Sequence, residues 1–100
     1  MLIAAGNINQ EYEVIGVVHA VVSRLPAKAG CGKPGALPVH EAYKAATKDL
    51  SDAAEASGAN GLIHVSYDHR MSAASVASGC GSETRAVFEV YAWGTAIRLP

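Results

Sequence analysis

The stretch VHEAYKAATKDLSDAAEAS, residues 39–57, decides the fold of this chain, because it carries the clearest periodic pattern in the sequence. Its apolar residues recur at the spacing of one helix face, and its charged residues fall on the opposite face. Pro38 suits the start of a helix, and Gly58 suits a left-handed stop. The pattern predicts one amphipathic helix, whose apolar stripe is Val39, Ala42, Tyr43, Ala46, Leu50, Ala53 and Ala54.

Segments that predict strands precede and follow this helix in the sequence. Residues 13–22 are rich in β-branched side chains and too apolar for a one-sided surface strand, so they predict a strand buried on both faces. Gly16 in its middle indicates a bulge or a close backbone approach. Residues 62–69, which follow an Asn-Gly turn, predict another strand, and residues 85–97 predict the last one. The short apolar segment 2–8 predicts an edge strand.

Two segments between these elements lack a regular pattern. Residues 23–38 contain several prolines and glycines and predict a long loop. Residues 70–84 are rich in Ser, Ala and Gly and predict a second long loop. Loops of this length in a small domain are commonly functional.

The order of elements is therefore β-β-α-β-β, which predicts the α+β class with one amphipathic helix packed on a mixed sheet. The strands before and after the helix should run parallel through a right-handed crossover, and the last strand should return antiparallel. The chain has 100 residues, a length that fits one domain over residues 1–100.

Composition narrows the range of partners. The eight Lys and Arg residues are scattered and the net charge is −1, so nucleic acid is not an expected partner. The first residues lack the basic and apolar regions of a signal peptide, and no apolar run approaches the roughly 18 residues of a membrane span. We therefore expect a cytoplasmic protein without a membrane partner.

The apolar composition also favours self-association. Hydrophobic residues make up 50% of the chain but aromatic residues only 6%, so most of the apolar mass is Ala and Val. Small side chains each bury little area, at about 0.8 kcal/mol per CH₂ group. A chain of this length hides only about two-thirds of its unfolded surface as a monomer. Further burial in a subunit interface would stabilise it, so we expect a homo-oligomer.

Three segments carry a likeness to a known family: YEVIGVV at residues 12–18, SGANGLIHVSYD at 57–68 and YAWGTAI at 91–97. In this order and spacing they resemble the YbjQ-like proteins, a bacterial family described as heavy-metal-binding. The likeness covers roughly residues 2–22 and 43–99, apart from the two loops. It implies a β-β-α-β-β subunit in a closed ring, commonly a pentamer, with strands pairing between subunits. It carries over no catalytic residue and no metal ligand.

Gly-Cys-Gly triplets surround Cys31 and Cys80, and they are not part of the family pattern. The predicted topology brings both cysteines to one end of the domain, together with His40 and His69. Two thiols and two imidazoles form a suitable ligand set for a divalent metal ion, zinc above all. The spacing matches no zinc motif, so a Cys31–Cys80 disulfide and ordinary loop thiols remain open alternatives.

Other polar residues do not assemble into a catalytic set. His19 and His64 lie mid-strand and would meet if their strands were neighbours, although hydrogen-bonded core or interface histidines are the preferred interpretation. Asp68 and His69 are adjacent in a strand and should point to opposite faces. With no nucleophile, acid and base visible together, we expect a non-enzymatic protein. The first hypothesis is an oligomeric metal-binding protein, and the alternative is a scaffold ring whose loops bind a protein partner.

Overall fold

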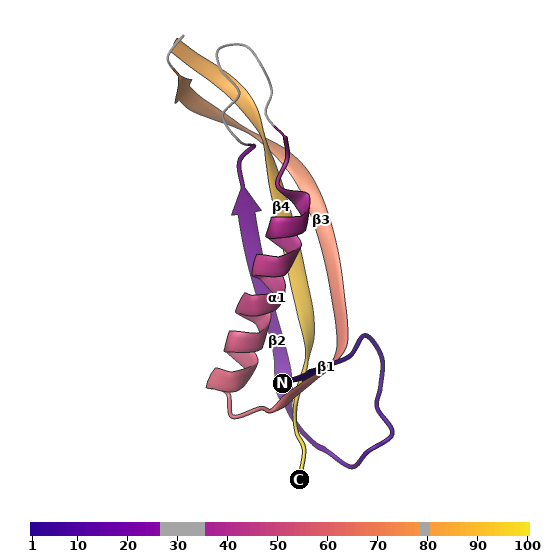
Figure 1. Ribbon diagram of the computed structural model, residues 1–100. Coiled ribbons are helices and arrows are strands. Elements are labelled where there is room, and N and C mark those ends of the chain that lie inside the picture. The colour runs from indigo at the N-terminus through magenta and orange to yellow at the C-terminus, as the bar shows by residue number, and fades with distance from the viewer. Residues whose placement is uncertain (27–35, 79–80) are drawn as a thin grey trace.

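The structure is a computed structural model that describes residues 1–26, 36–78 and 81–100 (Figure 1). Within them the order β-β-α-β-β and the α+β class are confirmed. The predicted helix is also confirmed, and Gly58 after it has the left-handed φ of 91° that favours glycine. The elements are β1 (Leu2–Ile3), β2 (Glu13–Arg24), α1 (Val39–Ala56), β3 (Gly61–Ser78) and β4 (Gly81–Arg98).

The four strands form one mixed sheet in the order β1-β3-β4-β2. Strand β4 is antiparallel to both β2 and β3, so β2 and β3 run in the same direction. The predicted parallel arrangement is therefore confirmed, but β4 lies between these two strands. Strand β1 pairs in parallel with the start of β3.

The prediction of a loop over residues 70–84 is wrong for the described part of that segment. Strands β3 and β4 pair from Gly61 opposite Ile97 as far as Ser78 opposite Gly81. Ser and Ala side chains favour strands weakly, but an antiparallel ladder is held by backbone hydrogen bonds that every such residue supplies. The hairpin makes the molecule 57 Å long and only 20 by 17 Å across (Figure 1). Its radius of gyration, 17.4 Å, exceeds the roughly 13 Å of a compact domain of this length.

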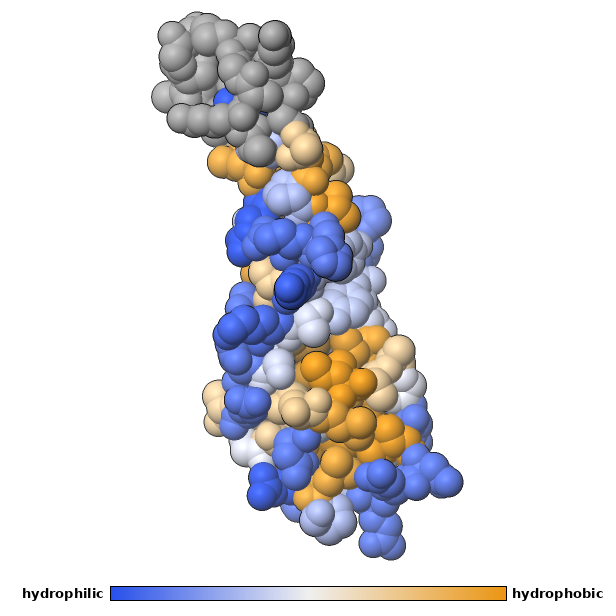
Figure 2. All heavy atoms as spheres, viewed as in Figure 1, coloured by the Kyte–Doolittle hydropathy of each residue, from blue (hydrophilic) through white to orange (hydrophobic). Residues whose placement is uncertain are grey.

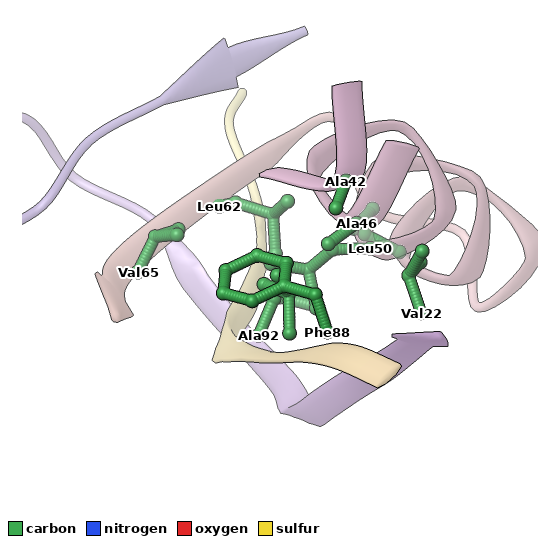
Figure 3. Close-up of a cluster of buried hydrophobic side chains, with 12 residues drawn as sticks. Val22, Ala42, Ala46, Leu50, Leu62, Val65, Phe88 and Ala92 are labelled. Carbon is green, nitrogen blue, oxygen red and sulfur yellow. The ribbon is translucent and has the colours of Figure 1, made fainter. Parts of the chain in front are cut away.

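The core lies between α1 and one face of the sheet (Figure 3). Leu50 is the one large residue among the buried side chains of α1, and the others are alanines, which let the helix lie close to the strands. Phe88 and Val90 of β4 and Val22 of β2 pack beneath them. The predicted stripe is confirmed at Ala42, Ala46, Leu50 and Ala54.

The prediction that residues 13–22 are buried on both faces is wrong for the subunit. Strand β2 lies at an edge of the sheet, and α1 covers only one of its faces. The opposite face leaves Val14, Val17 and Val21 exposed by 59%, 74% and 52%. The described residues contain one helix and no second layer for this face, so an apolar strand stays uncovered. The bulge expected near Gly16 is present, as a register shift between Val14 and Gly16.

Candidate functional site

Two of the four predicted metal ligands, Cys31 and Cys80, lie outside the described residues. The other two are exposed and lie toward the same end of α1. His40 is in the first turn of α1, and His69 on β3 has its Nδ1 3.0 Å from Oη of Tyr43, which follows His40 by almost one turn. No group of three or more His, Cys, Asp or Glu side chains that could hold a metal ion occurs within residues 1–26, 36–78 and 81–100.

The length of β3 separates His69 from the described end of the β3–β4 hairpin. The strand is continuous from His69 to Ser78, and nine residues at about 3.3 Å each separate the two by roughly 30 Å. His69 therefore lies far from the described end of the β3–β4 hairpin. For this reason the contributions of thiols and imidazoles to metal binding need separate tests.

The hypothetical contact between His19 and His64 does not form, because their strands are not neighbours. His19 pairs in register with Trp93 on β4. His64 falls in the register shift between Ile63 and Ser66, has a φ of 52°, and donates its backbone N–H to the carbonyl of Gly6. Its backbone is thus engaged by the segment after β1, away from His19.

The best-organised polar cluster surrounds Glu89, on the sheet face opposite α1. The hydroxyls of Tyr91 and Ser72 donate to its carboxylate at 2.7 and 2.9 Å, and Nε of Arg70 donates at 3.0 Å. The side chain of Glu89 is only 12% exposed. The hydrogen bonds from Tyr91, Arg70 and Ser72 stabilise the charged carboxylate, so the pKa of Glu89 falls from 4.5 to about 2. The hydrogen bond between Tyr91 and Glu89 also raises the pKa of Tyr91. Sequence reasoning missed this cluster.

Beside this cluster the sheet face is hollowed by a pocket of about 410 Å³. Trp93 is 41% exposed there, and the guanidinium carbon of Arg70 lies 5.9 Å from the centre of the Tyr91 ring. The pocket is therefore aromatic on β4 and charged on β3. Its lining is His19, Ala20, Val21, Asp68, Arg70, Tyr91, Ala92 and Trp93.

A second, larger groove of about 630 Å³ runs along α1 on the side of β1 and β3. Tyr67 lines it, with its hydroxyl 2.6 Å from Oγ1 of Thr47 and its ring edge-on to Tyr43 at 5.7 Å. Lys48 also lines it and pairs with Asp52 at 2.8 Å. The side chains of these two pairs therefore have partners within the chain, and His40 and Lys44 also line the groove.

The Glu89 cluster predicts a specific dependence of stability on pH. A carboxyl group whose pKa is lowered on folding contributes stability above its unfolded pKa and loses it as pH falls through the folded one. The stability difference between wild type and Glu89→Gln should therefore shrink as pH falls from 4.5 toward 2. Thermal unfolding of both proteins across this window measures it. A difference that stays constant over the window would contradict the assignment.

Comparison with known proteins supports the fold. No family model matches the chain. No curated protein matches it either. A solved structure does: a protein of unknown function from Pediococcus pentosaceus, described as a member of the DUF74 family, is similar over 100% of this chain and 98% of its own, with a TM-score of 0.72 and 22% identity. At that identity the likeness shows a DUF74-like fold alone. Among the described residues, α1 is not long and apolar enough to cross a membrane.

Proposed function

We propose that this protein is a non-enzymatic, cytoplasmic binding module that works as a homo-oligomer, with subunits joined through open strand edges. One observation carries the proposal: β2 is a 12-residue edge strand whose outward face exposes three valines. A long apolar edge strand is prone to pair with another chain unless it is covered. Assembly of identical subunits would cover it in a controlled way.

The opposite side of the sheet offers a matching edge. Strand β1 pairs only with Gly61 and Leu62 of β3, and further backbone bonds from the N-terminal segment reach no farther than Val65. From residue 66 to 78, β3 has no strand partner on this side within the described chain. Figure 2 shows a patch of apolar side chains beside α1 near β1, where Met1, Leu2 and Ile3 are all exposed. The β2 edge therefore combines free backbone groups with apolar side chains, and the β3 edge combines free backbone groups with an apolar patch at its β1 end.

The directions of the strands suit a repeated contact between these two edges. Because β2 and β3 run in the same direction, the β2 edge of one copy placed against the β3 edge of the next would continue the sheet in parallel. Such a contact joins two different surfaces, and it closes into a ring when its rotation allows. The YbjQ-like resemblance favours a ring of five subunits or a multiple of five.

What the assembly binds is proposed from the sequence. The proposed ligands of a divalent metal ion are Cys31 and Cys80, and zinc is the most suitable ion because thiolate and imidazole are its preferred ligands. His40 and His69 are candidate ligands to be tested separately, because His69 lies roughly 30 Å from Ser78 along β3. The alternative is a scaffold that presents segments 24–37 and 70–84 to a protein partner, with incidental cysteines. Strands β3 and β4 extend beyond the start of α1 (Figure 1), and this shape favours the presentation of one end of the subunit in either case.

A native mass spectrum of protein purified without chelator tests assembly and metal binding together. We expect a multiple of the 10.3 kDa subunit, with close to one metal ion per subunit. The double variant Cys31→Ser/Cys80→Ser should lose that ion and keep the assembly, and His40→Ala/His69→Ala shows separately whether the imidazoles contribute. A wild-type assembly without metal would leave the scaffold alternative, and a 10.3 kDa species alone would refute the proposal.

A further inference from the structure

We propose that the pocket on the sheet face opposite α1 binds a free amino acid with an aromatic side chain. Its walls combine an exposed indole, Trp93, with two side chains of opposite charge, Asp68 and Arg70. A zwitterion with an aromatic ring would match all three groups at once. This inference does not depend on subunits joining through their strand edges.

Strand register places the two charged groups side by side. Asp68 and Arg70 are two residues apart on β3 and pair with Tyr91 and Glu89 on β4. Residues two apart on a strand share a face and lie roughly 7 Å apart along it. An ammonium group beside Asp68 and a carboxylate beside Arg70 would therefore be neighbours, as they are in a free amino acid.

Arg70 is held in position for this role. Its Nε and Nη2 donate to Glu89 at 3.0 and 3.4 Å, while Nη1 has no hydrogen-bond partner in the described chain. Glu89 is in turn held by Ser72 and Tyr91. A guanidinium fixed by a carboxylate keeps a donor free for an incoming carboxylate, at a smaller entropy cost than a mobile side chain.

Asp68 retains a free acceptor as well. Its Oδ1 accepts the backbone N–H of His69 at 2.8 Å, which fixes the carboxylate, and its Oδ2 has no hydrogen bond to a described residue. Tyr91 on the central strand β4 is the register partner of Asp68 on one side and of Val21 of β2 on the other. The ammonium group of a ligand would thus find a fixed carboxylate oxygen next to an aromatic ring.

Aromatic side chains and pocket size favour a ring on the ligand. Trp93 and Tyr91 share a face of β4, and Trp93 presents an exposed indole on which a ring could stack. The pocket volume of about 410 Å³ falls in the lower part of the roughly 300–1,000 Å³ range of small-molecule sites. That space suits one ring with a short polar group and is small for a peptide or a nucleic acid.

The single tryptophan of the chain provides the measurement. Titration of the assembled wild-type protein with L-phenylalanine should change Trp93 fluorescence saturably. Phenethylamine lacks the carboxylate and 3-phenylpropionate lacks the ammonium group, so each should bind at least about tenfold more weakly. Asp68→Asn and Arg70→Gln should each weaken phenylalanine binding about tenfold or more. Arg24→Gln is the matched control, because Arg24 pairs with Glu41 on the other face of the sheet, and it should bind like wild type.

Several outcomes would overturn the proposal. One is fluorescence that does not respond to phenylalanine up to about 10 mM, since weaker binding would be negligible. Others are equal binding of phenylalanine and phenethylamine, or equal effects of Arg70→Gln and Arg24→Gln. A Trp93 that acrylamide cannot quench in the assembled protein would show that another copy covers the pocket, which also overturns it. Native mass spectra of the same samples report assembly separately, so failure of this proposal is distinguishable from failure of self-association.

Discussion

Replacement of Leu50 by alanine is expected to lower the free energy of unfolding by about 3 kcal/mol. Leu50 is fully buried and is the one large residue among the buried side chains of α1. Its removal would leave a cavity between the helix and the sheet. The neighbouring helix residues on that face, Ala46 and Ala54, are too small to fill this cavity. The loss in free energy of unfolding should therefore be well above the free energy of transferring the removed methyl groups to water.

Urea denaturation at a fixed subunit concentration measures this effect, because oligomerisation makes apparent stability depend on concentration. Leu25→Ala is the matched control. Leu25 is 46% exposed, so the same chemical change should cost less than about 1 kcal/mol there. Equal losses at the two positions would mean that the layer between α1 and the sheet is not the core of this protein.

Replacement of Val17 by lysine is expected to dissociate the oligomer into subunits that remain folded. Val17 is the most exposed valine of β2, at 74%, so a lysine is tolerated in the free subunit. In the proposed contact Val17 would lie beside a side chain of the next copy's β3, where a lysine loses apolar packing across the two strands. Lysine on edge strands is also a natural device against pairing between chains.

Sedimentation velocity of wild type and variant at equal concentration measures this dissociation. Ala56→Lys is the matched control, because Ala56 is exposed at the end of α1, on the other side of the sheet from Val17, and a positive charge is favoured at a helix C-terminus. The control should sediment as wild type does. An unchanged oligomer in Val17→Lys would exclude the outward face of β2 from the subunit contact.

The sequence predicts the local elements well and the long pairings less well. The 3.6-residue pattern over residues 39–57 and the stop at Gly58 identify α1 because both signals are local. The composition of residues 70–84 predicts a loop, because Ser, Ala and Gly favour strands weakly. Their pairing with β4 depends on backbone bonds between chain segments that no local pattern reveals.

The exposure of β2 could not be predicted for a similar reason. Its Val-rich composition correctly predicts a strand, but burial on both faces needs a second covering layer, which the described part of the subunit does not supply. The Glu89 cluster depends on register, because Arg70 and Ser72 come from β3, and Glu89 and Tyr91 from β4. Alternation along β4 places Glu89 and Tyr91 on one face, but nothing in the sequence aligns them with Arg70.

Hydrogen exchange at the backbone amides of β2 tests the central claim most directly. In a free subunit, only the amides bonded to β4 are protected, while those on the open edge of Glu13–Arg24 exchange quickly. If the β2 edge pairs with another copy, amides on both sides of the strand should be protected in the assembled protein, and the second set should lose protection in Val17→Lys. Rapid exchange along the open edge of β2 in the intact wild-type protein would contradict the account.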